Sequence, residues 1–150
     1  MKILLYVTFV ILYGLLLFKL PTLYSKKKVL LITGGGILVG LLFLVIAYFS
    51  FLMYASKYDN SLLVYEKQFL NICMGVVALF FFSFFVLLFV DTILDSVLVR
   101  FHQTYNSQNI DRNPVRFFIG NVEKIKVGIK LLFFLGGFLV FYGICFGASK

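Results

Sequence analysis

Residues 68–90, QFLNICMGVVALFFFSFFVLLFV, contain no Asp, Glu, Lys or Arg and consist mainly of Phe, Val, Leu and Ile. An α-helix needs roughly 20 consecutive apolar residues to cross a lipid core about 30 Å thick, so this stretch is long enough to span a membrane. Strands of a membrane barrel alternate polar and apolar side chains. Residues 76–90 do not alternate, which favours a helix.

Three further stretches, residues 3–18, 29–56 and 131–149, are also free of charged side chains. Of the 150 residues, 62% are hydrophobic and 13% are charged, whereas soluble domains carry about 25% charged residues. Four such stretches with short links use nearly the whole chain. We therefore expect a single all-α integral membrane domain over residues 1–150, a bundle of four transmembrane helices. The expected helices are about 3–19, 29–56, 68–104 and 116–148.

The first apolar segment could also be read as a cleaved signal peptide. Its apolar run is at the long limit for such a peptide, and no small-x-small cleavage site follows it. Lys19, Leu20 and Pro21 come instead. We expect a retained helix that ends before Pro21, with the Lys19 side chain reaching the membrane interface.

Beyond Val90 the helical pattern of the third segment continues, so we expect this helix to project into the cytoplasm. It should end at residues 104–114, TYNSQNIDRNP, which are rich in turn formers. Residues 116–130 interleave apolar and charged side chains. That pattern indicates either an interfacial helix or the charged foot of the fourth helix.

Basic residues are distributed unevenly between the two predicted membrane faces. Of the fourteen, four lie in residues 19–28 and six in residues 100–130. Because cytoplasmic segments are enriched in Lys and Arg, we expect both termini outside the cytoplasm, in a bacterial inner membrane or, alternatively, an organellar one. Contact with anionic headgroups explains the net charge of +8 without nucleic acid. The residues expected at headgroups are Lys26, Lys27, Lys28, Arg112, Arg116, Lys124, Lys126 and Lys130.

Small residues recur on one face of the second and fourth predicted helices. Small side chains at such spacings let helix backbones approach closely in a membrane. We therefore expect these two helices to cross closely, within one chain or between copies. Alternatively, residues 34–36, all glycine, could unwind the second helix and expose its backbone to a substrate. The expected packing residues are Thr33, Gly36, Gly40 and Ala47, with Gly136, Gly143 and Gly147.

Asp91, Asp95 and His102 are separated by four and seven residues, which places them on one side of a helix. Two carboxylates and an imidazole could bind a divalent cation or pass protons. Alternatively, these groups face water or headgroups, or pair with basic residues of the fourth helix. The possible basic partners are Lys124, Lys126 and Lys130.

Cys73 and Cys145 lie at similar predicted depths, so a disulfide is conceivable; the alternative is two small buried apolar side chains.

The chain has one histidine and lacks GxSxG, HExxH, nucleotide-binding and haem-binding motifs. An enzyme would need a polar cluster inside a cavity, and the sequence pattern reveals none. No cofactor or metal is expected.

The sequence therefore predicts a non-catalytic structural or accessory subunit of a membrane complex or homo-oligomer. Its expected partners are membrane lipids and other membrane subunits or copies of itself. One alternative is an oligomeric ion channel or pore, including a stress or defence effector, with Asp91, Asp95 and His102 at its cytoplasmic mouth. A membrane enzyme acting on lipid is a third reading.

Overall fold

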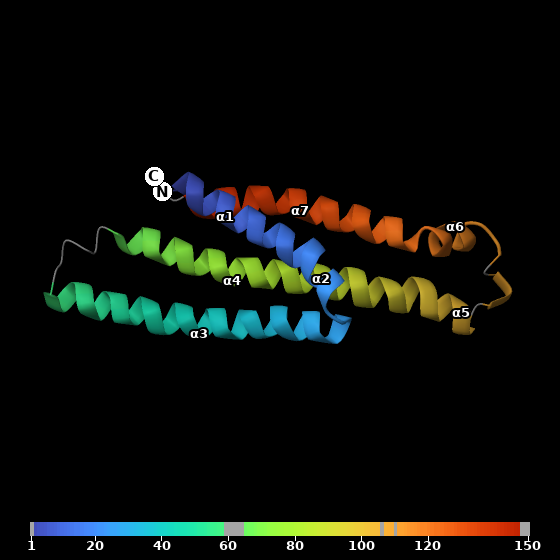
Figure 1. The fold of residues 1–150 in the computed structure, drawn as a ribbon, viewed down its shortest axis with the longest axis horizontal. Coiled ribbons are helices and arrows are strands. Elements are labelled where there is room, and N and C mark those ends of the chain that lie inside the picture. Colours follow the sequence, from blue (N-terminus) through green and yellow to red (C-terminus); the bar gives the residue numbers. More distant parts are fainter. Residues whose placement is uncertain (1, 59–64, 106, 110, 148–150) are drawn as a thin grey trace.

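The computed structural model describes residues 2–58, 65–105, 107–109 and 111–147, and all regular structure within them is helical. Four helical segments are long and apolar enough to cross a membrane. They run antiparallel in sequence order as one bundle (Figure 1). The predicted all-α bundle of four transmembrane helices is confirmed. The candidate spans are Lys2–Leu23, Lys26–Lys57, Gln68–Ile93 and Val122–Phe146.

The first span does not end before Pro21, as the sequence predicted, but continues to Leu23. Proline lacks an N–H, and its ring clashes with the carbonyl four residues earlier in a regular α-helix. A π-helical turn lies just before it, where the Leu20 N–H bonds the Leu15 carbonyl and widens the helix locally. The elements are α1 (Lys2–Gly14), η1 (Leu15–Lys19) and α2 (Leu20–Leu23).

The second span is α3 (Lys26–Tyr58), an unbroken α-helix of 33 residues. Tyr24 adopts an extended conformation, with φ −132° and ψ 155°, and separates α2 from α3. Lys26, Lys27 and Lys28 therefore form the first turn of α3 instead of a link. Because the helix continues through residues 34–36, the alternative of an unwound glycine segment is wrong.

The third span belongs to a continuous helix over residues 66–105. At 1.5 Å per residue it is about 60 Å long, roughly twice the thickness of a lipid core. Figure 1 shows its α5 end running well beyond the connection between α2 and α3. The predicted projection is confirmed, while its cytoplasmic location stays a prediction. The elements are α4 (Glu66–Leu88), η3 (Phe89–Ile93), η4 (Asp95–Arg100) and α5 (Phe101–Tyr105).

The segment predicted as one helix over 116–148 is two helices. Asn121 breaks the helix, with φ −115° and ψ 13°, and its side-chain amide donates to the Phe117 carbonyl at 2.9 Å. The charged residues 123–130 are therefore the foot of the last span. The predicted outer link 57–67 lies largely outside the described residues, as do residues 148–150. The elements are η5 (Ser107–Asn109), α6 (Val115–Gly120) and α7 (Val122–Phe146).

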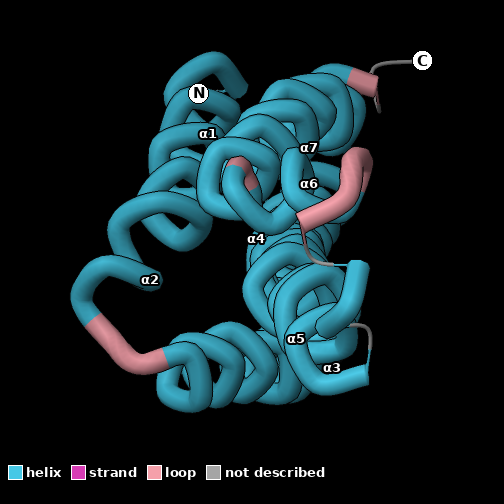
Figure 2. Tube along the Cα trace, turned by 90° about the vertical axis from the view of Figure 1, so that its right-hand side faces the viewer, coloured by secondary structure: helices cyan, strands magenta, loops and turns pink. Residues whose placement is uncertain are grey.

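Helix α4 lies at the centre of the bundle. It contacts α3 on one side and α1 and α7 on the other (Figure 2). Between α1 and α7 the core is aromatic: the Phe141 ring lies 5.6 Å from that of Phe9 and 5.5 Å from that of Tyr13, centroid to centroid. Gly75 and Gly137 lie directly against the Phe9 and Tyr13 rings, which a β-carbon at either position would displace.

The small residues of α3 pack against α4, not against α7. A β-carbon at Gly36 would collide with the Phe80 ring of α4, whereas one at Gly136 or Gly143 of α7 would meet nothing within 4 Å. The predicted crossing of these two helices within one chain is therefore wrong, because the rings of α4 occupy the small-residue face of α3. A crossing between copies stays a prediction.

The other predicted packing residues have different surroundings. Thr33 is fully buried, and its hydroxyl donates to the Val29 carbonyl of its own helix at 2.9 Å. Gly40 lies near Val77 of α4. Ala47 is half-buried, and Gly147 directly follows α7.

A candidate functional site at the charged end of the bundle

A pocket of about 370 Å³ lies where the four spans end on one side of the bundle. Parts of α2, α3, α7 and the π-helical turns border it, so all four spans contribute to its wall. Apolar side chains, including Leu17, Phe18 and Leu87, form one part of the lining. Six charged side chains also line it: Lys26, Asp91, Asp95, Glu123, Lys126 and Lys130.

Asp95 joins three elements through its two carboxylate oxygens. Lys126 of α7 lies 2.5 Å from Oδ1, and Lys26, at the start of α3, donates to Oδ2. Lys126 also donates to Glu123 Oε1, one turn earlier on its own helix, at 2.7 Å. The Lys126 side chain is only 7% exposed. These bonds connect the second, third and fourth spans at one end.

A second ion pair lies one turn closer to the middle of the bundle. Lys130 of α7 donates to Asp91 Oδ2 at 2.8 Å, and the side chains are 11% and 18% exposed. Both residues fall within candidate spans. The third and fourth spans are antiparallel, so the step of four residues from Asp91 to Asp95 runs beside the step of four residues from Lys130 back to Lys126. The two ion pairs therefore stack along one contact between helices.

Burial and hydrogen bonding act in opposite directions on Asp95. Burial alone would raise the pKa of its carboxyl group, but hydrogen bonds from Lys126 and Lys26 outweigh burial and hold the pKa below its ordinary value. Asp95 is therefore ionised at neutral pH. Removing one partner from a buried ion pair leaves an uncompensated charge and costs about 3–5 kcal/mol.

Three π-helical turns border this pocket. η1 supplies Leu17 and Phe18, η3 supplies Asp91 and Thr92, and η4 begins at Asp95. Such turns are rare in proteins and occur frequently at functional sites. Their concentration here distinguishes this end of the bundle from the aromatic core.

The three residues predicted to handle ions are not brought together. Asp91 and Asp95 line the pocket, whereas His102 lies on α5 with its ring 5.6 Å from that of Phe101. Among the described residues, no group of three or more His, Cys, Asp or Glu side chains is arranged to hold a metal ion. The two carboxylates bind Lys126 and Lys130, two of the three basic partners that the sequence offered.

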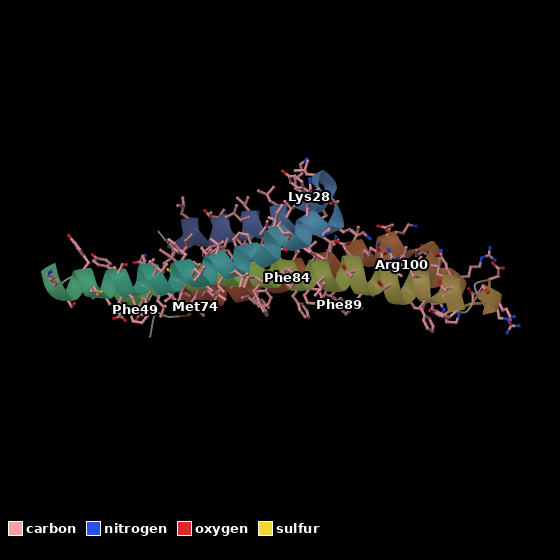
Figure 3. The ribbon with its side chains drawn as sticks, turned by 90° about the horizontal axis from the view of Figure 1, so that it is seen from below. Lys28, Phe49, Met74, Phe84, Phe89 and Arg100 are labelled. Atoms are coloured by element: carbon pink, nitrogen blue, oxygen red, sulfur yellow. The ribbon has the colours of Figure 1, made fainter. Side chains whose placement is uncertain are left out.

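The predicted headgroup residues divide into two sets. Lys126 and Lys130 are buried, because the carboxylates of the third span hold both ammonium groups inside the bundle. Contact of these two lysines with headgroups stays a prediction. Figure 3 shows Lys28 and Arg100 toward one end, with Phe49 and Met74 toward the other. The exposed set is Lys26, Lys27, Lys28, Arg112, Arg116 and Lys124.

Sequence reasoning missed the polar cluster inside a cavity. Its signal was present as two pairs at the same spacing, Asp91 with Asp95 and Lys126 with Lys130. Side chains four residues apart share a helix face, so antiparallel helices with these pairs can match charge to charge. Lys26 carried no such signal, because it reaches Asp95 only through the turn between α2 and α3.

Cys73 and Cys145 are both free thiols, and both are buried. The disulfide alternative is therefore not realised, and the thiols pack as small apolar groups.

In the comparisons with known proteins, no protein-family model matches this chain, and no curated protein or solved structure matches it either. The fold and the pocket therefore define only the class of protein: an integral membrane protein with a four-helix bundle and a charged pocket at one end.

Proposed function

We propose that this chain is a non-catalytic membrane subunit that assembles with other membrane subunits or with copies of itself. The observation that carries the proposal is an open face of α7. Gly136 and Gly143 lie on this face with free space around them, between the exposed side chains of Leu132, Leu135 and Leu139.

Exposed leucines alone would indicate only contact with lipid. Glycines among them are different, because they lower the helix surface and let a second backbone approach closely, where dispersion and Cα–H contacts stabilise the association. Within the chain, the neighbouring Gly137 already serves this purpose by accommodating Tyr13. Gly136 and Gly143 have no such neighbour in the part of the chain that the structure describes, so this face suits another helix.

The charged pocket supports the non-catalytic part of the proposal. Asp91, Asp95 and Glu123 each bind a lysine of the same chain. A general base or nucleophile works best when its reactive atom faces the substrate and its pKa lies near the operating pH. Held in ion pairs, with the pKa of Asp95 lowered, these carboxylates suit a structural role better.

The test is the mass of the assembly after gentle extraction, for the wild type and for Gly136→Leu and Gly143→Leu. A β-carbon at either position meets nothing within 4 Å inside the chain, so we expect a leucine there to leave the fold intact. It should separate the associating helices and weaken association by roughly tenfold or more, the effect of about 1.4 kcal/mol. Native mass spectrometry across a dilution series measures this change.

Two further variants control for folding. A β-carbon at Gly35 of α3 also meets nothing within 4 Å, so Gly35→Leu should fold and associate like the wild type. Gly137→Leu displaces Tyr13 and should lower the melting temperature of the bundle itself. Unchanged association in both Gly136→Leu and Gly143→Leu would refute assembly through this face.

The composition of the extracted assembly also separates this proposal from its alternative. Foreign subunits at fixed stoichiometry support an accessory subunit. A closed ring of identical chains that conducts ions in liposomes supports the oligomeric pore instead. In that case Asp91→Asn with Asp95→Asn should change the cation preference, and unchanged selectivity would exclude these carboxylates from the conduction path.

A further inference from the structure

We propose that the charged pocket binds the headgroup of a zwitterionic phospholipid whose cation is a primary ammonium, as in phosphatidylethanolamine. The lysines receive the phosphate, and the carboxylates receive the ammonium. This proposal concerns the pocket at the charged end and does not depend on the α7 face, so either can fail without the other.

The pocket lies beside the ends of the candidate spans, which is where lipid headgroups are expected. Its wall comes from residues 17–24 and 26–30, on either side of the turn between α2 and α3, and from residues 87–95 and 123–130. Each of these ranges adjoins the end of a candidate span, and all four meet on the same side of the bundle. We expect a cavity in this position to meet the interfacial layer of a single leaflet.

The charged side chains retain hydrogen-bonding capacity after their ion pairs form. An ammonium group has three N–H donors. Lys26 uses one donor on Asp95, and Lys130 uses one on Asp91. Asp91 accepts through Oδ2 and Glu123 through Oε1, which leaves the second oxygen of each carboxylate for another donor. Donors and acceptors for a ligand are therefore both present.

The charge of the lining selects the class of headgroup. Three lysines and three carboxylates line the pocket, so it has no net charge with which to attract an anionic lipid. A phosphate joined to an ammonium matches both signs at once. A primary ammonium donates hydrogen bonds to carboxylates, whereas the quaternary ammonium of phosphatidylcholine has no N–H to donate.

The remaining lining fits the apolar part of the same molecule. Leu17, Phe18 and Leu87 belong to the membrane-spanning part of their helices and border the charged groups. Ligand pockets are typically 300–1,000 Å³ and combine apolar walls with a few placed polar groups. The volume of about 370 Å³ falls within that range.

The experiment measures which lipid remains bound. The full chain is reconstituted with equal amounts of phosphatidylethanolamine, phosphatidylcholine and phosphatidylglycerol, and native mass spectrometry counts the lipids retained after a detergent wash. We expect phosphatidylethanolamine to be retained about tenfold over phosphatidylcholine, because one charge-assisted hydrogen bond distinguishes them. Equal retention of these two lipids, or preference for phosphatidylglycerol, would overturn the proposal.

Neighbouring lysines of α3 provide a matched pair of variants. Lys26 lines the pocket and is 61% exposed, so Lys26→Gln should fold and retain less phosphatidylethanolamine, because one phosphate contact is lost. Lys28→Gln removes the same charge from an exposed residue outside the lining and should retain as much phosphatidylethanolamine as the wild type. Equal loss in both variants would mean that unspecific surface charge retains the lipid, which contradicts a built site.

A second variant tests the ammonium end of the ligand independently. Glu123 is 80% exposed, so Glu123→Gln should fold normally and reduce the retention of phosphatidylethanolamine relative to phosphatidylcholine. An unchanged ratio would overturn the role of the carboxylates. Soluble glycerophosphoethanolamine separates a lipid from a free phosphate ester: we expect it to displace the lipid only in large excess, and displacement at equal concentration would exclude a lipid ligand.

Discussion

Asp95 is the residue at the charged end that forms ion pairs with two other spans. It accepts from Lys126 and Lys26, which come from different spans. The sequence placed Asp95 on a helix face beside Asp91 but could not identify its partners, because helix periodicity fixes direction within an element and not which neighbour lies opposite. The sequence pattern placed Lys26 in the link between the first two helices and therefore could not predict that Lys26 pairs with Asp95.

The stability of the bundle should depend on the protonation of Asp95. Burial opposes its ionisation, yet hydrogen bonds from Lys126 and Lys26 lower its pKa below the ordinary value. A carboxyl group with a lowered folded-state pKa stabilises the fold above its unfolded-state pKa of about 3.9, and this contribution is lost as the pH falls through the folded-state pKa. We expect the melting temperature in detergent to be steady above about pH 5 and to fall in more acidic solution.

The variant Asp95→Asn tests the origin of that acid sensitivity. It should melt at a lower temperature than the wild type at neutral pH, because Lys126 loses its buried partner, and its melting temperature should change less between pH 5 and pH 3. Asp111→Asn, in the exposed turn after η5, should leave the acid profile unchanged. Identical profiles for Asp95→Asn and the wild type would show that other carboxyl groups cause the acid sensitivity.

At the scale of elements, charge-free runs located all four spans because lipid requires long apolar helices. Their ends were harder to place. The first span continues past Pro21 through a π-helical turn, and Asn121 separates α6 from α7. Both features depend on local hydrogen bonds that apolar patterning does not encode. The pairing of α3 with α4 depends on the fit of Phe80 against Gly36, which spacing within either helix cannot reveal.

The ion pair between η3 and α7 predicts a specific double-mutant result. Lys130→Met leaves the Asp91 carboxylate buried without a partner and should destabilise the bundle by about 3 kcal/mol. Adding Asp91→Leu removes that charge and should recover most of the loss, because a well-packed apolar pair often replaces a buried ion pair at little cost. Thermal unfolding in detergent measures both variants.

Additive destabilisation in this cycle would contradict a direct interaction between Asp91 and Lys130. Lys124→Met is the matched control, since Lys124 lies on the same helix but is exposed. It should change stability by no more than about 0.5 kcal/mol. A loss as large as that of Lys130→Met would indicate a general effect of charge at the foot of α7.

At the scale of the whole molecule, each proposal above requires four crossings of the membrane. The start of α1 and the end of α7 lie toward the same end of the bundle (Figure 1), as an even number of crossings demands. The charge pattern further predicts that the ion-pair end faces the cytoplasm. The pocket would then contact the cytoplasmic leaflet, and α5 would extend beyond it.

The most direct test is the accessibility of single cysteines to a membrane-impermeant thiol reagent, with Cys73 and Cys145 replaced by alanine. Ser25→Cys lies between α2 and α3, Ser107→Cys lies in η5, and Ser56→Cys lies near the far end of α3; all three positions are exposed. We expect positions 25 and 107 to react only from the cytoplasmic side and position 56 only from the opposite side. Reaction of positions 25 and 56 from the same side would mean that α3 does not cross the membrane, which would contradict the four-span bundle.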